Sequence, residues 1–391
     1  MDIKQRIISI AQELGFHRVV IASLEPMAAE RLEYEQWLAK GFAASMEYLK
    51  RNPHFRTSPK LLYPGSQSAI LVSVSYYTEP PPQPAPYFGR VARYAVGLDY
   101  HEVIAARLAR LQEAIEEEIG RPLGSKSFSD DVALYEQAFA ERHGLGFAGR
   151  HSLIIGPALS GSYFFIAELF TDLVLPADEP YRGTCGQCIR CASACPTDAI
   201  KPGSEVDANL CISYLTIENK GGIPLALRSS LGQWVFGCDV CQEVCPYNQR
   251  PLPTPWPEFE PAAGVGHHLD LIALLAIGSP AEFRLRFAHT PLLRPKRRGL
   301  LRNGLVVLGN ALALAQKDSL PGRSLESAWM EDVVQALARF VQAETDVMLR
   351  EHAAWALSQA KRLGQKVLLR MQADEEDPQV HRQISLYLGD S

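Results

Sequence analysis

The residues of this sequence whose types and spacing are most suited to chemistry are its 8 cysteines, which all lie between Cys185 and Cys245. Disulfides that stabilise a secreted chain are distributed along it, whereas these thiols are confined to one segment of a chain in which we see no export signal. Thiols clustered in this way are typical of metal ligands. We therefore expect this segment to bind metal.

The first four cysteines have the spacing of a bacterial ferredoxin. They form the pattern C-x-x-C-x-x-C-x-x-x-C-P from Cys185 to Pro196. In this pattern three thiolates hold one 4Fe-4S cluster, and the fourth cysteine ligates a second cluster. A second run, C-x-x-C-x-x-x-C-P from Cys238 to Pro246, is one cysteine short of a repeat, and Cys211 supplies the missing thiolate.

The 8 thiolates suffice for two clusters with four ligands each. By analogy with two-cluster ferredoxins, we expect one quartet of Cys185, Cys188, Cys191 and Cys245 and a second of Cys195, Cys211, Cys238 and Cys241. The alternative is a pair of four-thiolate zinc sites, which C-x-x-C pairs also permit. Zinc does not require this spacing with a proline after each terminal cysteine, so the pattern favours iron–sulfur clusters and electron transfer.

Helices and strands are predicted together in the region before the cysteines. Helical periodicity over 3–14 is followed by a β-branched run at 17–22, which predicts a helix and then a strand. The run 68–77 predicts a buried strand, and the apolar positions within 104–120 predict one face of a helix that ends near its glycine. Two apolar runs within 152–169 are typical of a hairpin.

The fold class that these patterns predict is α+β, with three consecutive domains. We expect a mixed α/β domain over 1–177, a ferredoxin-like two-cluster domain over 178–258 and an all-α domain over 259–391. In the last of these, 302–309 resembles 350–357 at a separation of about 48 residues, which is close to the period of HEAT-type helical pairs. An ordinary helical bundle is an equal alternative.

Composition excludes several classes of protein. The chain has 391 residues, of which 47% are hydrophobic, so it can bury a core. Its net charge of -5 argues against nucleic-acid binding through bulk charge, which leaves only a local basic patch. The first residues lack a signal-peptide layout and we find no apolar stretch of membrane-spanning length, so we expect a cytoplasmic protein with no membrane partner.

The electron acceptor should lie before the cysteines, because a ferredoxin alone would be far shorter. No G-x-G-x-x-G motif follows a predicted strand, and no G-x-x-x-x-G-K-[S/T] phosphate loop occurs. We therefore predict neither a nicotinamide nor a Rossmann-type flavin site. The residues alone indicate a two-cluster redox enzyme with a second centre that they do not name.

Several motifs resemble those of the epoxyqueuosine reductases. The segments 130–136, 140–147 and 161–164 follow the family pattern D-[T/S]-x-x-x-x-[E/D], A-x-x-x-G-[L/I]-G-[W/F] and G-S-[W/Y], and 211–216 and 236–242 match as well. The resemblance extends over nearly the whole chain. It implies that the first domain binds cobalamin, that two 4Fe-4S clusters feed it, and that the enzyme reduces epoxyqueuosine to queuosine at the tRNA wobble position. This reaction is the last step of queuosine biosynthesis.

Within this resemblance, Asp130 corresponds to the family's proton donor. Opening an epoxide and releasing its oxygen as water requires protons, while reduced cobalt and the clusters supply two electrons. The alternative is that Asp130 caps a helix that begins near Val132. The adjacent Asp131 stands where the family usually has a small hydroxyl residue, which leaves the register between the two carboxylates open.

The resemblance also indicates which residues line the corrinoid pocket. These are Arg56, Asp130, Ser213, Cys238 and Asp239. Three of them belong to the cysteine segment, as expected if one cluster approaches the corrin. The alternatives are a surface arginine, a capping serine, an aspartate that forms a turn and a cysteine that serves only as a cluster ligand.

A basic island lies in the predicted all-α domain. No Asp or Glu occurs between Arg284 and Lys317, a range that holds eight basic residues. The family makes a tRNA with a GUN anticodon the partner, so we expect phosphate contacts from the island and one further lysine. The expected contacts are Lys220, Lys296, Arg297, Arg298 and Arg302. A solvated basic face is the alternative.

Residues near the substrate base are expected to be Arg93, Tyr94, Tyr100 and His101, because the base must leave its stack to reach cobalt. Gln137 stands where family members often carry arginine, which puts one contact in doubt. An external electron donor is implied, and we expect a monomer. The competing functions are a corrinoid iron–sulfur reductase of a small molecule, such as a dehalogenase, and an electron-transfer or corrinoid-carrier protein.

Overall fold

The computed structural model describes residues 2–156, 161–317 and 327–389. The chain divides into two compact units, each made of segments that are not consecutive in sequence. Unit 1 comprises Met1–Glu79, Arg93–Cys211 and Asp239–Gly264, and unit 2 comprises Pro80–Ala92, Ile212–Cys238 and Val265–Ser391. Each unit therefore draws on all three of the predicted domains 1–177, 178–258 and 259–391. The three-domain division stays a prediction.

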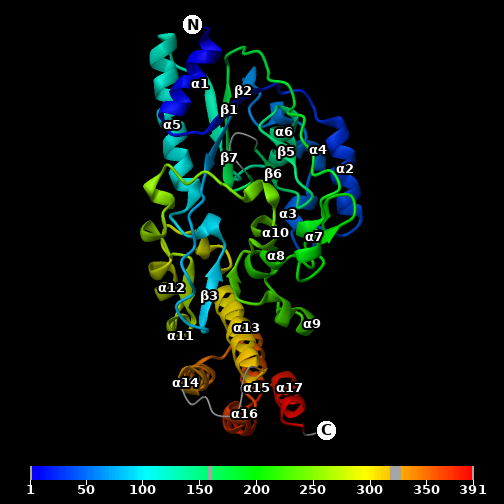
Figure 1. The fold of residues 1–391 in the computed structure, drawn as a ribbon, viewed down its shortest axis with the longest axis vertical. Coiled ribbons are helices and arrows are strands. Elements are labelled where there is room, and N and C mark those ends of the chain that lie inside the picture. The colour runs from blue at the N-terminus through cyan, green and yellow to red at the C-terminus, as the bar shows by residue number, and fades with distance from the viewer. Residues whose placement is uncertain (1, 157–160, 318–326, 390–391) are drawn as a thin grey trace. The chain divides into compact units, whose positions relative to one another are not determined.

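The centre of unit 1 is a four-stranded antiparallel sheet with the order β1-β2-β7-β4 (Figure 1). Its strands are β1 (Arg18–Ala22), β2 (Ser68–Ser75), β7 (Phe164–Thr171) and β4 (Ser125–Phe128). β2 is buried along its whole length, including its three serines, in agreement with the buried strand predicted there. The predicted strands at 17–22 and 68–77 are thus confirmed as β1 and β2.

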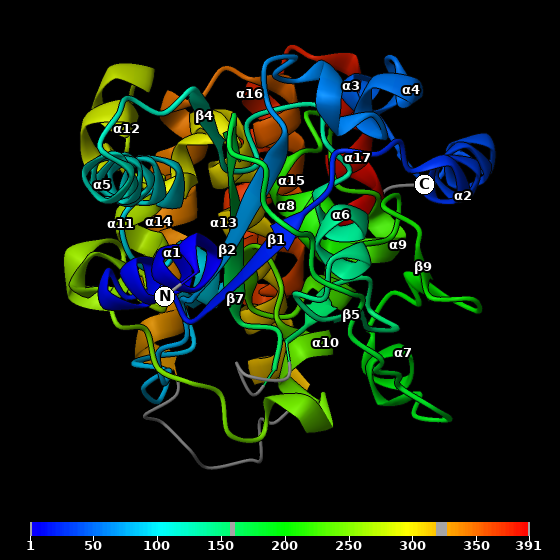
Figure 2. The ribbon, with the colours of Figure 1, turned by 90° about the horizontal axis from the view of Figure 1, so that it is seen from above.

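Helices cover both faces of this sheet. α1 (Ile3–Glu13) and α5 (Tyr100–Ile119) cover one face, where Ile7 and Ile104 pack with Ile70 and Leu169. α6 (Glu136–Arg142) covers the other face, where its Phe139 packs in a second core cluster. Figure 2 shows α1 and α5 on one side of the strands and α6 on the other. The strand alternation therefore assigns every side chain of β7 to one of two cores.

The predicted helix within 104–120 is confirmed and extended at its start. Asp99 caps α5 by accepting a hydrogen bond from the His101 N–H at 3.1 Å. Gly120 ends the helix in the left-handed region, at φ 69°, and its N–H bonds the Glu116 carbonyl. The helix predicted over 3–14 is confirmed as α1.

The predicted hairpin within 152–169 is wrong in its pairing. Its first arm forms β6 (Ile154–Ile155), which pairs with β5 (Phe147–Ala148) in a separate two-stranded sheet. Its second arm is β7, which pairs with β2 and β4. Within the described residues the two arms meet at the bridge Gly156–Gly161, and residues 157–160 lie outside them. Long-range pairing with β2 takes the place of the local partner.

Short elements complete unit 1. They are α2 (Ala28–Ala39), α3 (Glu47–Lys50), α4 (Pro53–Arg56), α7 (Arg190–Ala194), β8 (Ile200–Lys201), β9 (Glu205–Val206) and α10 (Val240–Glu243). α7 lies within the first cysteine run and α10 within the second, and these two helices contact each other.

Unit 2 combines a small sheet with helices. Its sheet has the order β10-β3-β11, from β10 (Trp234–Phe236), β3 (Phe88–Val91) and β11 (His268–Asp270). Its helices are α8 (Ile212–Ile217), α9 (Leu225–Arg228), α11 (Leu271–Leu275), α12 (Pro280–Arg286), α13 (Lys296–Lys317), α14 (Ser327–Ala343), α15 (Val347–Gln359), α16 (Arg362–Asp374) and α17 (Pro378–Leu388). Beyond residue 270 the described elements are helices, but the range 259–391 that was expected to be all-α also contains β11, because this segment pairs with β3. No helix among the residues described here combines the length and hydropathy that crossing a membrane requires.

The helices of unit 2 are arranged as stacked pairs. α13 packs on α15 and α15 packs on α17, while α14 contacts α16 (Figure 1). Gly309 of α13 makes the first contact close, because a Cβ there would meet the Trp355 ring at 2.5 Å. The two similar segments, 302–309 and 350–357, belong to α13 and α15. This arrangement favours a HEAT-like repeat over a simple bundle.

Arg302 corrects one of the tRNA expectations. Its side chain is 0% exposed, and its guanidinium donates to the carbonyls of Leu215, Asn219 and Gly221. The neighbouring Asn303 donates to the carbonyls at 216 and 235. Arg302 is therefore unavailable to a phosphate, and it holds the segment after α8 in place. The sequence around Arg302 does not predict its burial, because the carbonyls that accept its hydrogen bonds lie more than 80 residues away along the chain.

We expect Arg302→Met to destabilise unit 2 by on the order of 3 kcal/mol, because buried carbonyls would lose their donors. The matched change Arg284→Met, at an exposed position of α12, should alter stability by less than about 0.5 kcal/mol. Urea unfolding followed by circular dichroism measures both. Equal midpoints for the two variants would contradict the structural role of Arg302.

Candidate functional site

Asp130 lies in the loop between β4 and α6 of unit 1. Its backbone is in the left-handed region at φ 58°, and its side chain is exposed. The Tyr100 hydroxyl, at the first residue of α5, donates to its Oδ2 at 2.8 Å. The residue before α6 is Tyr135, so Asp130 is not the cap of that helix. An exposed carboxyl oriented by a phenol is suited to exchange protons with a bound molecule.

Tyr100 is itself held by aromatic stacking. Its ring lies nearly parallel to the Phe165 ring of β7, with the ring centroids 4.5 Å apart. The ring of the adjacent His101 also stacks on it, with a centroid distance of 4.0 Å. Burial raises the pKa of the Tyr100 hydroxyl, and the Asp130 carboxylate acts in the same direction. Tyr100 therefore remains a hydrogen-bond donor at neutral pH.

The two residues beside this pair have different roles. The His101 Nδ1 lies 2.7 Å from Asp99 Oδ1, and this hydrogen bond raises the pKa of His101. Asp131 Oδ1 accepts the Ser129 N–H at 3.0 Å and so turns back on its own loop. Of the two adjacent carboxylates, Asp130 is the one with the tyrosine donor, which favours the predicted register.

A pair of carboxyl groups on the α6 side of the sheet was missed by sequence analysis. Glu136 begins α6, and its Oε1 accepts the Asp130 N–H at 3.2 Å. Its side chain also interacts with that of Glu168 on β7, which is 0% exposed. Burial raises the pKa of both, to about 8 for Glu136. The available signal was a single glutamate in the otherwise apolar run of β7.

Asp239 is a buried member of a polar network in unit 1. Asp239 Oδ2 accepts two hydrogen bonds from Arg93, one from its backbone N–H at 2.8 Å and one from its Nη1 at 3.1 Å. Asp239 Oδ1 accepts a hydrogen bond from Gln242 Nε2 at 3.2 Å. Arg93 also pairs with Glu243 at 2.9 Å. Sequence analysis placed Arg93 near the substrate and Asp239 on the corrinoid. The structure shows them bound to each other, where they hold the loop around Cys241.

The first predicted cysteine quartet gathers in unit 1. Cys185 packs against Cys245, and the thiols of Cys191 and Cys245 both interact electrostatically with Cys185, while Cys188 acts on Cys245. Burial raises the pKa of the Cys191 and Cys245 thiols, an effect that bound iron would overcome by binding thiolate. All 8 cysteines are described, and none forms a disulfide. This arrangement fits four ligands of one cluster.

The second quartet draws on both units. Cys195, Cys211 and Cys241 belong to unit 1, whereas Cys238 belongs to unit 2. The Cys195 sulfur accepts the Ala199 N–H at 3.4 Å, a contact that stabilises a thiolate. The grouping of these four residues stays a prediction.

The other predicted corrinoid contacts are also divided between the units. Arg56, Asp130 and Asp239 lie in unit 1, and Ser213 and Cys238 lie in unit 2. The Arg56 guanidinium donates to the Tyr48 carbonyl, but its Nε is buried with no acceptor among the described residues. An orphaned buried donor fits the amide or phosphate oxygens of a corrinoid. Ser213 is half-buried in α8.

The remaining basic candidates are largely paired with acids from elsewhere in unit 2. Arg298 lies 2.6 Å from Asp346, and Arg297 lies 2.8 Å from Glu344. Lys220 donates to the carbonyl of Ile217, and burial lowers its pKa. Lys296 is exposed at the start of α13. The eight positive charges counted along the sequence therefore overstate the charge that the folded surface offers.

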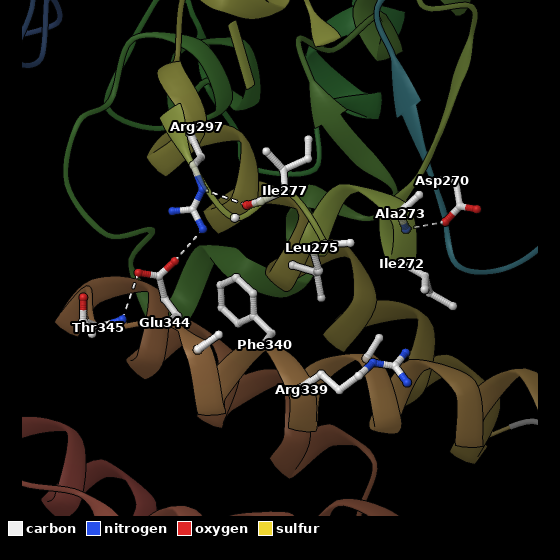
Figure 3. Close-up of a pocket in the computed structure, with 14 residues that line it drawn as sticks. Asp270, Ile272, Ala273, Leu275, Ile277, Arg297, Arg339, Phe340, Glu344 and Thr345 are labelled. Atoms are coloured by element: carbon white, nitrogen blue, oxygen red, sulfur yellow. Dashed lines mark hydrogen bonds and ion pairs between the residues drawn. The ribbon is translucent and has the colours of Figure 1, made fainter. Parts of the chain in front are cut away.

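Arg297 faces a cavity of unit 2 (Figure 3). The cavity, of about 640 Å³, is lined mainly by apolar residues of α11 and α14. Within it the Arg297 guanidinium bonds the Ile277 carbonyl and Glu344. These contacts explain why Arg297 is only 16% exposed, and they favour a structural role.

Replacing Cys245 with serine should remove about half of the bound iron, because one quartet loses a ligand while the other is intact. Ser193→Ala, an exposed change beside the same quartet in α7, should leave the iron content unchanged. Visible absorbance and iron analysis of anaerobically purified protein measure both. Zinc without iron in the wild type would contradict the cluster assignment.

Comparisons with known proteins agree with this site. Residues 184–248 match a family model described as a 4Fe-4S double cluster binding domain, so the cysteine segment is an iron–sulfur domain rather than a pair of zinc sites. Residues 56–131 match a model described as epoxyqueuosine reductase QueG, DUF1730.

Similarity to characterised relatives extends over almost the whole chain. The epoxyqueuosine reductase of Xanthomonas campestris pv. campestris is 36% identical over 365 residues, covering 92% of this chain and 96% of that protein. The Escherichia coli enzyme is 35% identical, covering 92% and 89%. A crystal structure of an epoxyqueuosine reductase with a tRNA-Tyr epoxyqueuosine-modified stem loop matches with a TM-score of 0.85 at 26% identity, covering 99% and 98%. This chain belongs to the epoxyqueuosine reductase family of oxidoreductases.

Proposed function

We propose that this protein reduces epoxyqueuosine to queuosine in tRNA, with Asp130 as the proton donor. The observation that carries the proposal is the environment of Asp130, an exposed carboxyl that one tyrosine and one backbone contact hold in a fixed position, in a chain that belongs to this family throughout its length. The reaction it must support converts an epoxide, two electrons and two protons into an alkene and water.

The electron path follows from the cofactors that the residues fit. Bound cobalamin would supply a strongly reducing metal centre, and the clusters would deliver electrons to it one at a time from an external donor. The cysteine quartets would hold the clusters, and the Arg93–Asp239 pair fixes the residue before α10, the helix that carries Cys241. Arg56 offers its orphaned Nε to an acceptor on the cofactor.

Asp130 would place its proton on the epoxide oxygen as that oxygen gains negative charge. Protonation makes the oxygen a better leaving group, which is why an acid is needed beside the reacting bond. Tyr100 orients the Asp130 carboxyl by donating to Oδ2, which leaves Oδ1 available to carry the proton. An adjacent Tyr100–His101 stack could receive the base removed from the anticodon stack, since aromatic rings bind nucleobases by stacking.

The tRNA partner is supported by relatives rather than by one feature of this surface. A solved relative of this fold was crystallised with an epoxyqueuosine-modified tRNA stem loop, which supports a tRNA partner for this chain. On this chain the exposed Lys296, Arg284 and Arg298 are the better candidates for phosphate contacts, because Arg302 is buried and Arg297 is mostly buried. We also propose that the protein acts as a monomer.

Asp130→Asn should reduce turnover by at least about 100-fold, because the amide cannot donate a proton to the epoxide oxygen. Asp131→Asn is the matched control and should retain activity. The assay incubates anaerobically reduced, cobalamin-loaded protein with epoxyqueuosine-containing tRNA and detects the loss of one oxygen by mass spectrometry. Turnover by the Asp130 variant would refute its role, whereas inactivity of the wild type would refute the proposed function.

Charge reversal of Lys296 and Arg284 together should weaken tRNA binding and lower its salt dependence by about one unit of slope for each lost phosphate contact. Arg110→Glu, at an exposed position of α5, is the control outside the basic island. Binding measured over a salt series separates an electrostatic effect from misfolding. An unchanged slope would mean that these residues do not contact the phosphate backbone.

A further inference from the structure

A carboxylic acid is buried in the middle of the unit 1 sheet, and the reaction described above does not use it. Glu168 lies on β7, opposite Leu71 of β2 and Phe128 of β4. Its side chain is 0% exposed, and neither oxygen has a hydrogen-bond donor among the described residues. A buried ionised carboxylate without a donor is costly. The group must therefore either be neutral or serve a purpose that offsets this cost.

The ionisable groups that act most strongly on Glu168 are all acidic. They are Glu136 of α6 and Asp130 and Asp131 of the preceding loop. Glu136 is the member of this set whose side chain lies within reach of a carboxyl–carboxyl hydrogen bond to Glu168. Two carboxyl groups can form that hydrogen bond only if one of them carries a proton, because ionised carboxylates are acceptors only. A shared proton thus replaces the missing donor.

Glu136 connects this pair to Asp130. Its Oε1 accepts the Asp130 N–H at 3.2 Å, and the Asp130 backbone is in the left-handed region, at φ 58°. Tyr100 holds the side chain of the same residue from the other face of the sheet. The position of Asp130 therefore depends on Glu136 keeping its carboxylate directed at that N–H.

We propose that Glu168 is a positioning residue for Asp130: as a protonated acid, it donates a hydrogen bond to Glu136 and keeps Oε1 of Glu136 on the Asp130 backbone N–H. When Glu168 loses its proton, two carboxylates face each other without a donor, Glu136 is repelled, and the loop that carries Asp130 is released. The structural part of this inference stands alone, and its catalytic consequence rests on the proposed function.

Three variants test the arrangement. Glu168→Gln keeps a donor that has no proton to lose, so the loop should stay in place at all pH values. Glu168→Leu removes the donor, so the loop should be loosened at all pH values. Ser73→Ala is the matched control, because Ser73 lies on the same face of the neighbouring strand, is buried, and has a hydroxyl without a partner among the described residues.

The first measurement needs neither cofactor nor substrate. Protection of residues 129–135 against hydrogen exchange in the isolated protein should fall in the wild type and the control as the pH rises above the neutral range, remain high for Glu168→Gln, and be low throughout for Glu168→Leu. Infrared spectra should show a protonated carboxyl band at neutral pH that Glu168→Gln lacks. An unchanged band, or equal exchange in all variants, would overturn the proposal.

Stability gives an independent measure of the same proton. A carboxyl whose pKa is raised by folding stabilises the protein fully below its ordinary pKa, and this contribution is lost as the pH rises through the raised value. The wild type should therefore lose more thermal stability than Glu168→Gln does as the pH is raised from about 5 into the alkaline range. Parallel curves for the two proteins would show that Glu168 is already ionised. Should Glu168→Gln not fold, Glu136→Gln supplies the same donor from the other side.

The catalytic consequence is measured last. Glu168→Leu should lower kcat by about tenfold, the effect of one hydrogen bond, with KM for tRNA unchanged. Glu168→Gln should retain kcat at neutral pH and lose the decline that the wild type shows in alkaline solution. If the wild type does not act on epoxyqueuosine-containing tRNA, the proposed function fails, while exchange and infrared spectra still determine whether Glu168 positions Asp130.

Discussion

The candidate site depends on the pairing of β7 with β2 on one side and with β4 on the other. This pairing fixes the register, and the register determines which side chains of β7 face each core. Phe165 faces the α5 side, where it stacks on Tyr100, and Glu168 faces the α6 side, where it meets Glu136. A shift of one residue would exchange the two faces.

Asp130 follows directly from this geometry. Phe128, the last residue of β4, pairs with Glu168, so the chain leaves the sheet edge two residues before Asp130. A loop at the edge of a sheet is accessible to residues on both faces of that sheet. Tyr100 binds the Asp130 side chain from one face, and Glu136 binds the Asp130 backbone N–H from the other. The proposed proton donor is thus placed by the sheet rather than by its own loop.

Buried ion pairs and polar contacts perform the same task for the cysteine segments. Arg93 and Asp239 fix the loop around Cys241 in unit 1, and Arg302 and Asn303 fix the segment after α8 in unit 2. Metal-binding loops have little regular structure, so their backbone groups need partners from elsewhere. A buried polar group that loses its hydrogen-bond partner destabilises the protein. Each network therefore favours the one loop conformation in which all of its polar groups are paired. The sequence predicts Arg93 near the substrate base and Arg302 at a tRNA phosphate, and both side chains are buried. Burial could not be predicted from the sequence, because the order of charges along a chain does not show which distant residues cover them.

The sequence by itself determined what depends on local pattern. The cysteine spacing indicated the 4Fe-4S segment, and the periodicity of apolar residues located α1, β1, β2 and α5. The spacing of further motifs indicated the family and, through it, Asp130 as the candidate proton donor. Tertiary structure alone decided what depends on pairing between distant residues. It assigned β6 and β7 to different sheets, placed acids beside Arg297 and Arg298, and brought Glu168 to Glu136. The physical reason is that hydrogen-bond partners, burial and charge compensation are set by neighbours in space, and these neighbours come from remote parts of the chain.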